Sequence, residues 1–252
     1  MSSPPKPVLD ALRTRIRQIE TSEKRACGVL PFGLDAVDRR LPGGGLALGA
    51  LHEVAGGGSG ALNGAAAALF AAGVMARLDG PVLWCVSQRD LFAPALAQAG
   101  LHPDRVIYAE AGDDKAMLAC FEEGLRHGGL AGVVAELSGL PMTASRRLQL
   151  AAEASGVPGL AVRRWRRQSD ASDFGQPTAA VTRWRVSALP SEPLPVPGVG
   201  RPRWLVELIR SRAGECADFV LEACDEKGRL ALPADLADRS AAPGDGRVRA
   251  AA

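Results

Sequence analysis

From residue 28 onward, the hydrophobic pattern of the chain alternates between two kinds of segment. Short apolar runs with little polar alternation, typical of parallel strands covered on both faces, occupy residues 50–54, 82–87, 105–110, 132–137 and 159–164. Ala- and Leu-rich stretches, which predict helices, separate them at residues 62–78, 91–99, 113–127 and 143–155. The repeated order of strand and helix predicts an α/β fold with a mostly parallel sheet flanked by helices.

The pattern changes after residue 167. Residues 168–178 are typical of a loop, and three further strands are predicted at residues 181–188, 204–212 and 218–224. Antiparallel strands at one edge of the parallel sheet are the simplest assembly. Residues 189–202 contain five prolines, which lack the N–H that a sheet requires, so this segment is expected to be a surface loop.

The two ends of the chain differ from this core. Leu9, Leu12, Ile16 and Ile19 recur at helical spacing and predict one amphipathic helix. Its apolar stripe could pack on its own domain or dock on a partner, and periodicity does not distinguish these. The predicted organisation is an N-terminal helix and linker at residues 1–27, a core domain at 28–232 and a disordered tail at 233–252.

Composition narrows the function classes. The chain has 30 basic and 28 acidic residues, so its global field draws it neither to nucleic acid nor to anionic membranes. Five cysteines without a CxxC spacing suggest neither a disulfide framework nor a metal site. No apolar segment is long enough to span a bilayer. We therefore expect a cytoplasmic protein without a metal or other cofactor and without membrane contact.

The most informative segment joins a predicted strand to a predicted helix through a glycine-rich loop. Its residues are Gly56, Gly57, Gly58, Ser59, Gly60, Ala61 and Leu62. In a P-loop, backbone N–H groups surround the phosphates, a lysine reaches the outer phosphates and a hydroxyl holds magnesium. On that pattern Ala61 falls on the lysine and Leu62 on the hydroxyl. Alanine cannot supply a positive charge to the phosphates, and leucine cannot bind magnesium. ATP hydrolysis is therefore not expected, and a tight strand-to-helix turn is the favoured interpretation.

Residues 28–54 resemble the stretch that leads into the P-loop of RecA-like recombinases, with a Gly-Leu-Asp helix start and a glycine-rich turn before the strand. The resemblance places Gln88 where the recombinases carry a catalytic glutamate, and an amide cannot act as a base. It places Glu136 near the metal-organising aspartate. These two are degenerate acidic positions, and a single carboxylate does not make a site.

Longer phrases resemble the ImuA family, also described as SulA-like or RecA-like mutagenesis proteins. They are LPGGGL at 41–46, GALHE at 49–53, GPVLWC at 80–85, LPMTASRRLQLAAEASG at 140–156, AVTRWRV at 180–186 and GRPRWLVEL at 200–208. The resemblance implies a RecA-like fold and a non-catalytic accessory role in damage-induced (SOS) mutagenesis and translesion synthesis. It also implies an ImuB-like, polymerase-related partner, with an error-prone DnaE-type polymerase or RecA as further partners.

Several residues are candidates for contacts. Arginine beside an aromatic ring suits single-stranded DNA, and this chemistry is concentrated in Arg163, Arg164, Trp165, Arg166, Arg167, Arg183 and Arg185. The alternative, which we favour, is half-buried tryptophans with arginines directed to solvent, so DNA contact would be weak or indirect. For partner docking, the candidates are the N-terminal stripe and Trp204.

Two other functions stay open at this stage. One is an atypical RecA-like ATPase on single-stranded DNA, which would need an unconventional lysine such as Lys115. The other is a SulA-like inhibitor of cell division, which the alternative family name suggests. DNA-stimulated ATP turnover would identify the first, and inhibition of the division tubulin's GTPase would identify the second.

Overall fold

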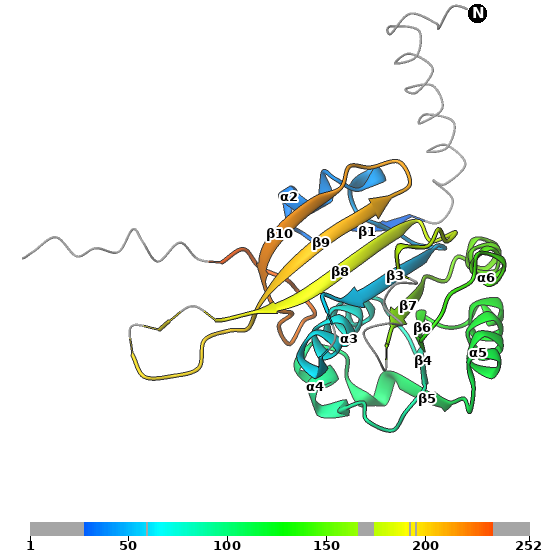
Figure 1. Cartoon of the computed structure of the whole chain (residues 1–252), viewed down its shortest axis with the longest axis horizontal. Helices are drawn as coiled ribbons and strands as arrows, with labels where there is room; N and C mark the ends of the chain where they lie inside the picture. Colours follow the sequence, from blue (N-terminus) through cyan, green and yellow to red (C-terminus); the bar gives the residue numbers. More distant parts are fainter. Residues whose placement is uncertain (1–27, 59, 166–173, 192, 195, 234–252) are drawn as a thin grey trace, which may run out of the picture.

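The computed structural model describes residues 28–58, 60–165, 174–191, 193–194 and 196–233 (Figure 1). Its centre is an eight-stranded sheet in the order β10-β9-β8-β3-β7-β6-β4-β5. The parallel part comprises β3 (Leu51–Gly56), β4 (Val82–Val86), β5 (Val106–Glu110), β6 (Gly132–Leu137) and β7 (Gly159–Arg163). The predicted parallel strands are therefore confirmed to within one or two residues at each end.

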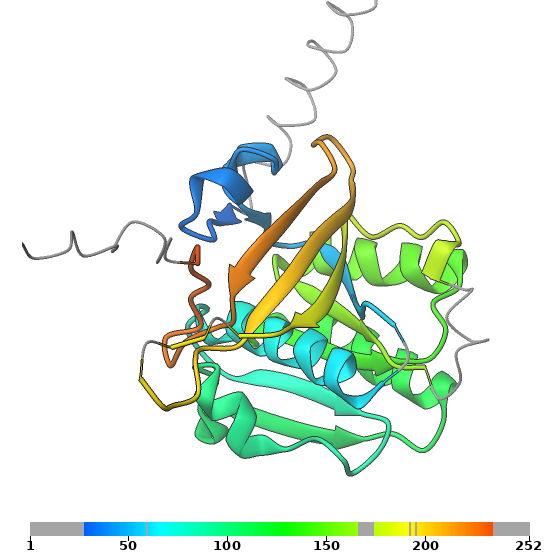
Figure 2. The same ribbon diagram turned by 60° about the vertical axis from the view of Figure 1, so that its left-hand side comes forward.

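Three strands extend the sheet beyond β3. β8 (Thr182–Leu189) pairs parallel with β3, while β9 (Arg203–Ser211) and β10 (Ala217–Glu222) pair antiparallel. The predicted antiparallel edge is confirmed, and the direction of the strands reverses between β8 and β9. Residues 190–202 connect these strands, and Figures 1 and 2 show this connection projecting from the body of the domain.

Helices cover both faces of the parallel strands. α3 (Ala61–Ala76) and α4 (Ala93–Gln98) lie on one face, and α5 (Asp114–His127) and α6 (Met142–Ser155) lie on the other (Figure 1). Local chemistry sets the helix ends. The side chain of Asp113 accepts a hydrogen bond of 2.7 Å from the N–H of Ala116 at the start of α5, which ends at a left-handed Gly128. None of the helices in the described part of the chain is both long and apolar enough to cross a membrane.

The segment before β3 adds a small layer. Two-residue strands β1 (Val29–Leu30) and β2 (Leu46–Ala47) pair antiparallel around the short helix α2 (Asp35–Asp38) and the 3-10 turn η1 (Pro42–Gly44). A second 3-10 turn, η2 (Pro103–Arg105), precedes β5. The pairing of β1 with β2 was not predicted, because strands of two residues carry no readable periodicity.

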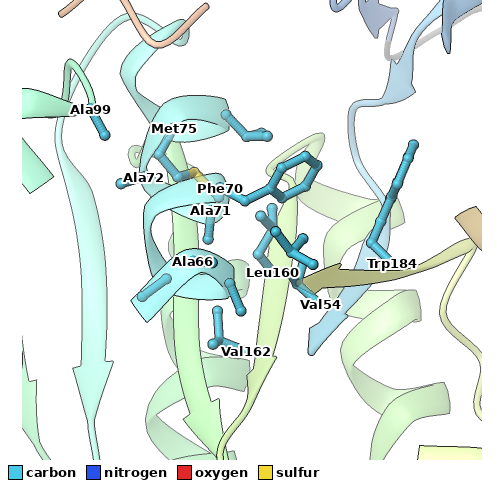
Figure 3. Close-up of a cluster of buried hydrophobic side chains, with 14 of the residues drawn as sticks. Val54, Ala66, Phe70, Ala71, Ala72, Met75, Ala99, Leu160, Val162 and Trp184 are labelled. Atoms are coloured by element: carbon cyan, nitrogen blue, oxygen red, sulfur yellow. The ribbon is translucent and has the colours of Figure 1, made fainter. Parts of the chain in front are cut away.

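The larger core lies under α3 (Figure 3). Val54, Leu160 and Val162 on the sheet face Phe70 and the alanines of α3, and Trp184 closes this cluster from β8. The rings of Phe70 and Trp184 lie 5.7 Å apart, and Phe32 packs on both of them. Because most core-facing side chains of α3 are alanines, the helix approaches the sheet closely. A second core under α5 and α6 contains Met117, Phe121 and Leu125.

Trp184 also completes a buried hydrogen-bonded chain. Its indole N–H donates to the Thr182 hydroxyl oxygen at 2.7 Å, and the Thr182 hydroxyl and Nδ1 of His52 lie 2.7 Å apart. Nε2 of His52 lies 2.8 Å from the carbonyl oxygen of Ala47. A neutral imidazole that donates through Nε2 and accepts through Nδ1 satisfies every group in this chain, which gives His52 a structural role.

A buried carboxylate joins the three strands at the middle of the sheet. Glu53 on β3 is fully buried and receives Arg163 from β7 at 2.8 Å and Arg183 from β8 at 2.9 Å. The Thr178 hydroxyl donates to the same carboxylate at 3.0 Å. Arg163 also donates to the carbonyl oxygen of Ser138 at 2.7 Å. A buried charge is tolerated only when it is paired and hydrogen-bonded, so these contacts fix the register of β7, β3 and β8.

We predict that Glu53→Gln lowers the free energy of unfolding by about 3–5 kcal/mol, because it leaves two buried guanidinium groups without their counter-charge. Chemical denaturation measures this. Arg89→Gln is the control, since it removes an exposed ion pair with Glu110 and should cost at most about 1 kcal/mol. Equal effects of the two substitutions would contradict a structural role for the Glu53 carboxylate.

Candidate functional site

The glycine-rich segment forms a loop between β3 and α3, as the sequence predicts. Gly60 precedes α3 with a φ of 150°, a conformation that favours glycine. Ala61 and Leu62 lie in the first turn of α3, and both side chains are exposed, Leu62 to 78%. Ser59 lies outside the described residues. The two positions of interest therefore present apolar side chains to solvent at the start of a helix.

Strand β8 holds this loop from one side. The N–H of Gly57 donates to the carbonyl oxygen of Val186 at 3.0 Å, and the N–H of Ala188 donates to the Asn63 side chain at 3.0 Å. A Cβ atom on Gly57 would lie 1.7 Å from Oγ of Ser187, so only glycine fits there. The Gly57 amide is thus used within the fold and is not directed toward an anion.

The loop forms one wall of a cleft of about 490 Å³. The lining from the loop and α3 is glycine, alanine and Leu69, and the facing wall is formed by Leu91, Phe92, Leu96 and Trp165. Phe92 is 67% exposed. The described lining contains no lysine, and its glycine, alanine, leucine and aromatic residues outnumber its charged residues, Asp90, Arg163 and Arg164.

The charged residues described in the lining of the cleft are Asp90, Arg163 and Arg164, and all three are paired, Arg163 with the buried Glu53. Arg164, which follows β7, donates to both carboxylate oxygens of Asp90 at 2.8 and 2.6 Å. The same guanidinium lies 3.1 Å from the buried carboxylate of Glu136. This triad leaves no unpaired charge among Asp90, Glu136 and Arg164 for a phosphate or a metal ion.

Glu136 stands at the end of β6, inside the protein. Burial raises the pKa of its carboxyl, and the pull of Arg164 opposes that effect. The indole N–H of Trp84 and the hydroxyl of Ser87 each lie 3.4 Å from its oxygens. Gln88, the other degenerate acidic position, is exposed beyond β4. Within the described part of the chain, no group of three or more His, Cys, Asp or Glu residues could hold a metal ion.

The basic and aromatic cluster is not one surface. Arg163 and Arg183 are buried on Glu53, which corrects the expectation that they face DNA or a partner and also the expectation that these arginines point to solvent. Arg185 is partly exposed and pairs with Glu207 at 2.5 Å. Trp165 packs edge-on against the ring of Phe174 at 5.4 Å. Arg166 and Arg167 lie outside the described residues.

The structure also corrects the partner-docking candidate on β9. Trp204 is only 3% exposed and belongs to the core under α3, so it cannot serve as a surface anchor. The N-terminal stripe of Leu9, Leu12, Ile16 and Ile19 lies outside the described residues.

Sequence reasoning did not single out Glu53, Asp90 or Phe92. For Glu53 a signal existed, because a glutamate in an otherwise buried strand needs a charged partner elsewhere in the fold. The arginines at the end of β7 and within β8, Arg163 and Arg183, were those partners. For Asp90 and Phe92 no local pattern marks them, since their roles depend on the loop and on Arg164, which are distant in sequence.

Comparison with solved structures supports the architecture. The crystal structure of the RadB recombinase superposes with a TM-score of 0.54 at 17% identity, over 81% of this chain and 99% of that one. That likeness shows a RecA-like fold. SulA from Pseudomonas aeruginosa superposes with a TM-score of 0.38 at 25% identity, over 45% of this chain and 96% of that one. This score is too low to indicate a shared fold.

No model of a protein family matches the chain. Two curated relatives do, both named Protein ImuA, from Caulobacter vibrioides strains NA1000 / CB15N and ATCC 19089 / CIP 103742 / CB 15. Each is 38% identical over 238 residues, which cover 89% of this chain and 96% of the relative. Identity at this level over nearly the full length of both proteins, together with the RecA-like fold, means that the chain belongs to the ImuA family.

Proposed function

We propose that this protein is a non-catalytic accessory protein of damage-induced mutagenesis and translesion DNA synthesis. In this proposal, the RecA-like domain is a scaffold that binds an ImuB-like, polymerase-related protein in the cytoplasm. Membership of the ImuA family supports the pathway. The DnaE-type polymerase and RecA remain proposed further partners, and contact with DNA would be weak or indirect.

One observation carries the non-catalytic part of the proposal. At the cleft beside the glycine-rich loop, Ala61 and Leu62 supply neither a cation nor a metal-binding hydroxyl. The carboxylates of Asp90 and Glu136 are held by Arg164. Phosphoryl transfer depends on positive groups and a metal ion that neutralise the charge of the transition state. We interpret the loop as a degenerate P-loop that now serves as a strand-to-helix turn.

The ATPase alternative has no support from the position of Lys115. This residue lies in the first turn of α5, on the face of the sheet opposite α3, and it does not line the cleft. The SulA-like alternative is left with no structural argument. A scaffold without nucleotide chemistry is therefore the function that the geometry supports best.

The scaffold proposal predicts partner binding that is independent of nucleotide. The purified full chain and the ImuB-like protein should form a complex in isothermal calorimetry, with the same dissociation constant in the presence and absence of MgATP. A complex that forms only with ATP would contradict the proposal, as would the absence of any complex.

If the Glu136 carboxylate stabilises the fold and does not bind a metal ion, removing its counter-charge, Arg164, should destabilise the protein in a pH-dependent way. Burial holds the folded-state pKa of Glu136 above its unfolded value, and Arg164→Met raises it further. Stability of the variant is then highest below the unfolded pKa and falls as pH rises through the folded pKa. We expect a loss of about 2 kcal/mol or more at about pH 7.5, and a smaller loss at about pH 5.

The matched control for that prediction is Glu136→Gln combined with Arg164→Met, which removes the buried charge as well. Denaturation curves for the double variant should show less destabilisation at about pH 7.5 than those for Arg164→Met alone, and little change with pH. A pH-independent loss in the single variant would contradict the structural role of this ion pair.

A further inference from the structure

We propose that the apolar cleft beside the glycine-rich loop is the docking socket for the polymerase-related partner, and that it receives one large aliphatic or aromatic side chain flanked by uncharged residues. This inference rests on the proposed function. It assigns a protein-binding role to the cleft beside the degenerate P-loop, for which the proposed function alone gives no role.

An exposed apolar side chain in the lining of the cleft and another beside that lining carry the first step. Leu62 is 78% exposed at the start of α3, and Phe92 is 67% exposed before α4. Leu62, Ala65 and Leu69 are three and seven residues apart, so Leu62 continues the helix face on which Ala65 and Leu69 line the cleft. Large side chains exposed together around a concave site indicate a binding surface, whereas an isolated exposed leucine does not.

Charge defines the occupant. The charged side chains described at the cleft are already paired, because Arg164 is held by Asp90 and Glu136 and Arg163 is held by Glu53. An acidic or basic group entering here would be desolvated without gaining a counter-charge, at a cost that its contacts would not offset. An uncharged apolar side chain avoids the cost of desolvating a charge and gains free energy from the burial of Leu69, Phe92 and its own surface.

The size of the cleft agrees with this occupant. A volume of about 490 Å³ accommodates one large side chain together with a short stretch of its backbone, and is too small for a whole helix. Protein interfaces commonly place such an anchor in a central pocket and surround it with near-neutral contacts. The partner should therefore present a single anchor residue at the carboxyl ends of β3, β4 and β7.

The same side of the domain offers additional apolar contacts. β8 contacts the loop through Val186 and contacts α3 through Ala188, and the connection that leaves β8 begins two residues later. This connection exposes Val196 to 64% and Val199 to 95%. Figures 1 and 2 show this connection projecting from the body of the domain beyond the end of β8, so we expect a partner seated in the cleft to contact it as well.

Affinity for the ImuB-like protein, measured by isothermal calorimetry with the full chain, tests the proposal. Leu62→Glu places a charge on the rim, and Ala65→Trp fills the cleft from an exposed position. Each should weaken binding by about tenfold or more. Leu150→Glu is the matched control, since Leu150 is 64% exposed on α6, on the opposite face of the sheet. The affinity of this variant for the ImuB-like protein should stay within about twofold of that of the unchanged chain.

The outcomes separate the inference from the proposed function. Loss of affinity in both cleft variants, with the control unchanged and all melting temperatures similar, supports the socket. Equal affinity in every variant overturns the socket while the scaffold function stands, as does an equal loss in the control. If the unchanged chain does not bind, the proposed function fails, and the inference fails with it. Should Leu62→Glu prove unstable, Ala65→Trp decides alone.

Discussion

The buried carboxylate of Glu53 is the contact on which the middle of the sheet depends. It lies on β3 and is fully buried, so it must be paired, and its partners come from the strands on either side. Arg163 belongs to β7 and Arg183 to β8. The two guanidinium groups therefore join three neighbouring parallel strands, β7, β3 and β8, and the strand direction reverses only beyond β8. Any change in register of these strands would separate the charges.

This constraint also positions the cleft. β3 continues into the glycine-rich loop, and β7 continues into Arg164, so fixing the two strands fixes the loop and the cation at a set separation. Arg164 then reaches Asp90 and Glu136. In the proposed function, the charged groups at the cleft stabilise the domain through ion pairs and do not serve nucleotide chemistry. The remaining surface of the cleft is mostly apolar. In the proposed function, the same loss of nucleotide chemistry accounts for both a non-catalytic role and an apolar cleft that we propose as the docking socket.

The fold was predictable from sequence to the extent that it depends on local periodicity. Strand β6 was predicted with its observed bounds, and the other long strands and helices were predicted to within two residues at each end. Two-residue strands were missed, since they carry no period. The RecA-like arrangement came from the resemblance, because hydrophobic patterns alone do not specify strand order.

The candidate site was less predictable, because burial of a polar residue depends on what lies across the sheet. In the segment from Arg183 to Arg185, the pattern Arg-Trp-Arg resembles a basic surface with an aromatic platform. Glu53 lies on the neighbouring strand, and Arg183 is buried because it pairs with that carboxylate. Arg185 instead pairs with Glu207 near the surface. The sequence pattern alone does not distinguish the two arginines. Trp204 was misassigned for the same reason, since its neighbours in the core come from distant parts of the chain.

The central claim is that the glycine-rich loop no longer binds nucleotide, and calorimetric titration of the full chain with MgATP tests it most directly. The titration should be run with and without single-stranded DNA. The account predicts no detectable heat of binding in either condition, because Ala61 and Leu62 offer no charge or metal ligand and Arg164 is already paired. Binding with a dissociation constant in the micromolar range would contradict it and would restore the recombinase-like ATPase as the leading interpretation.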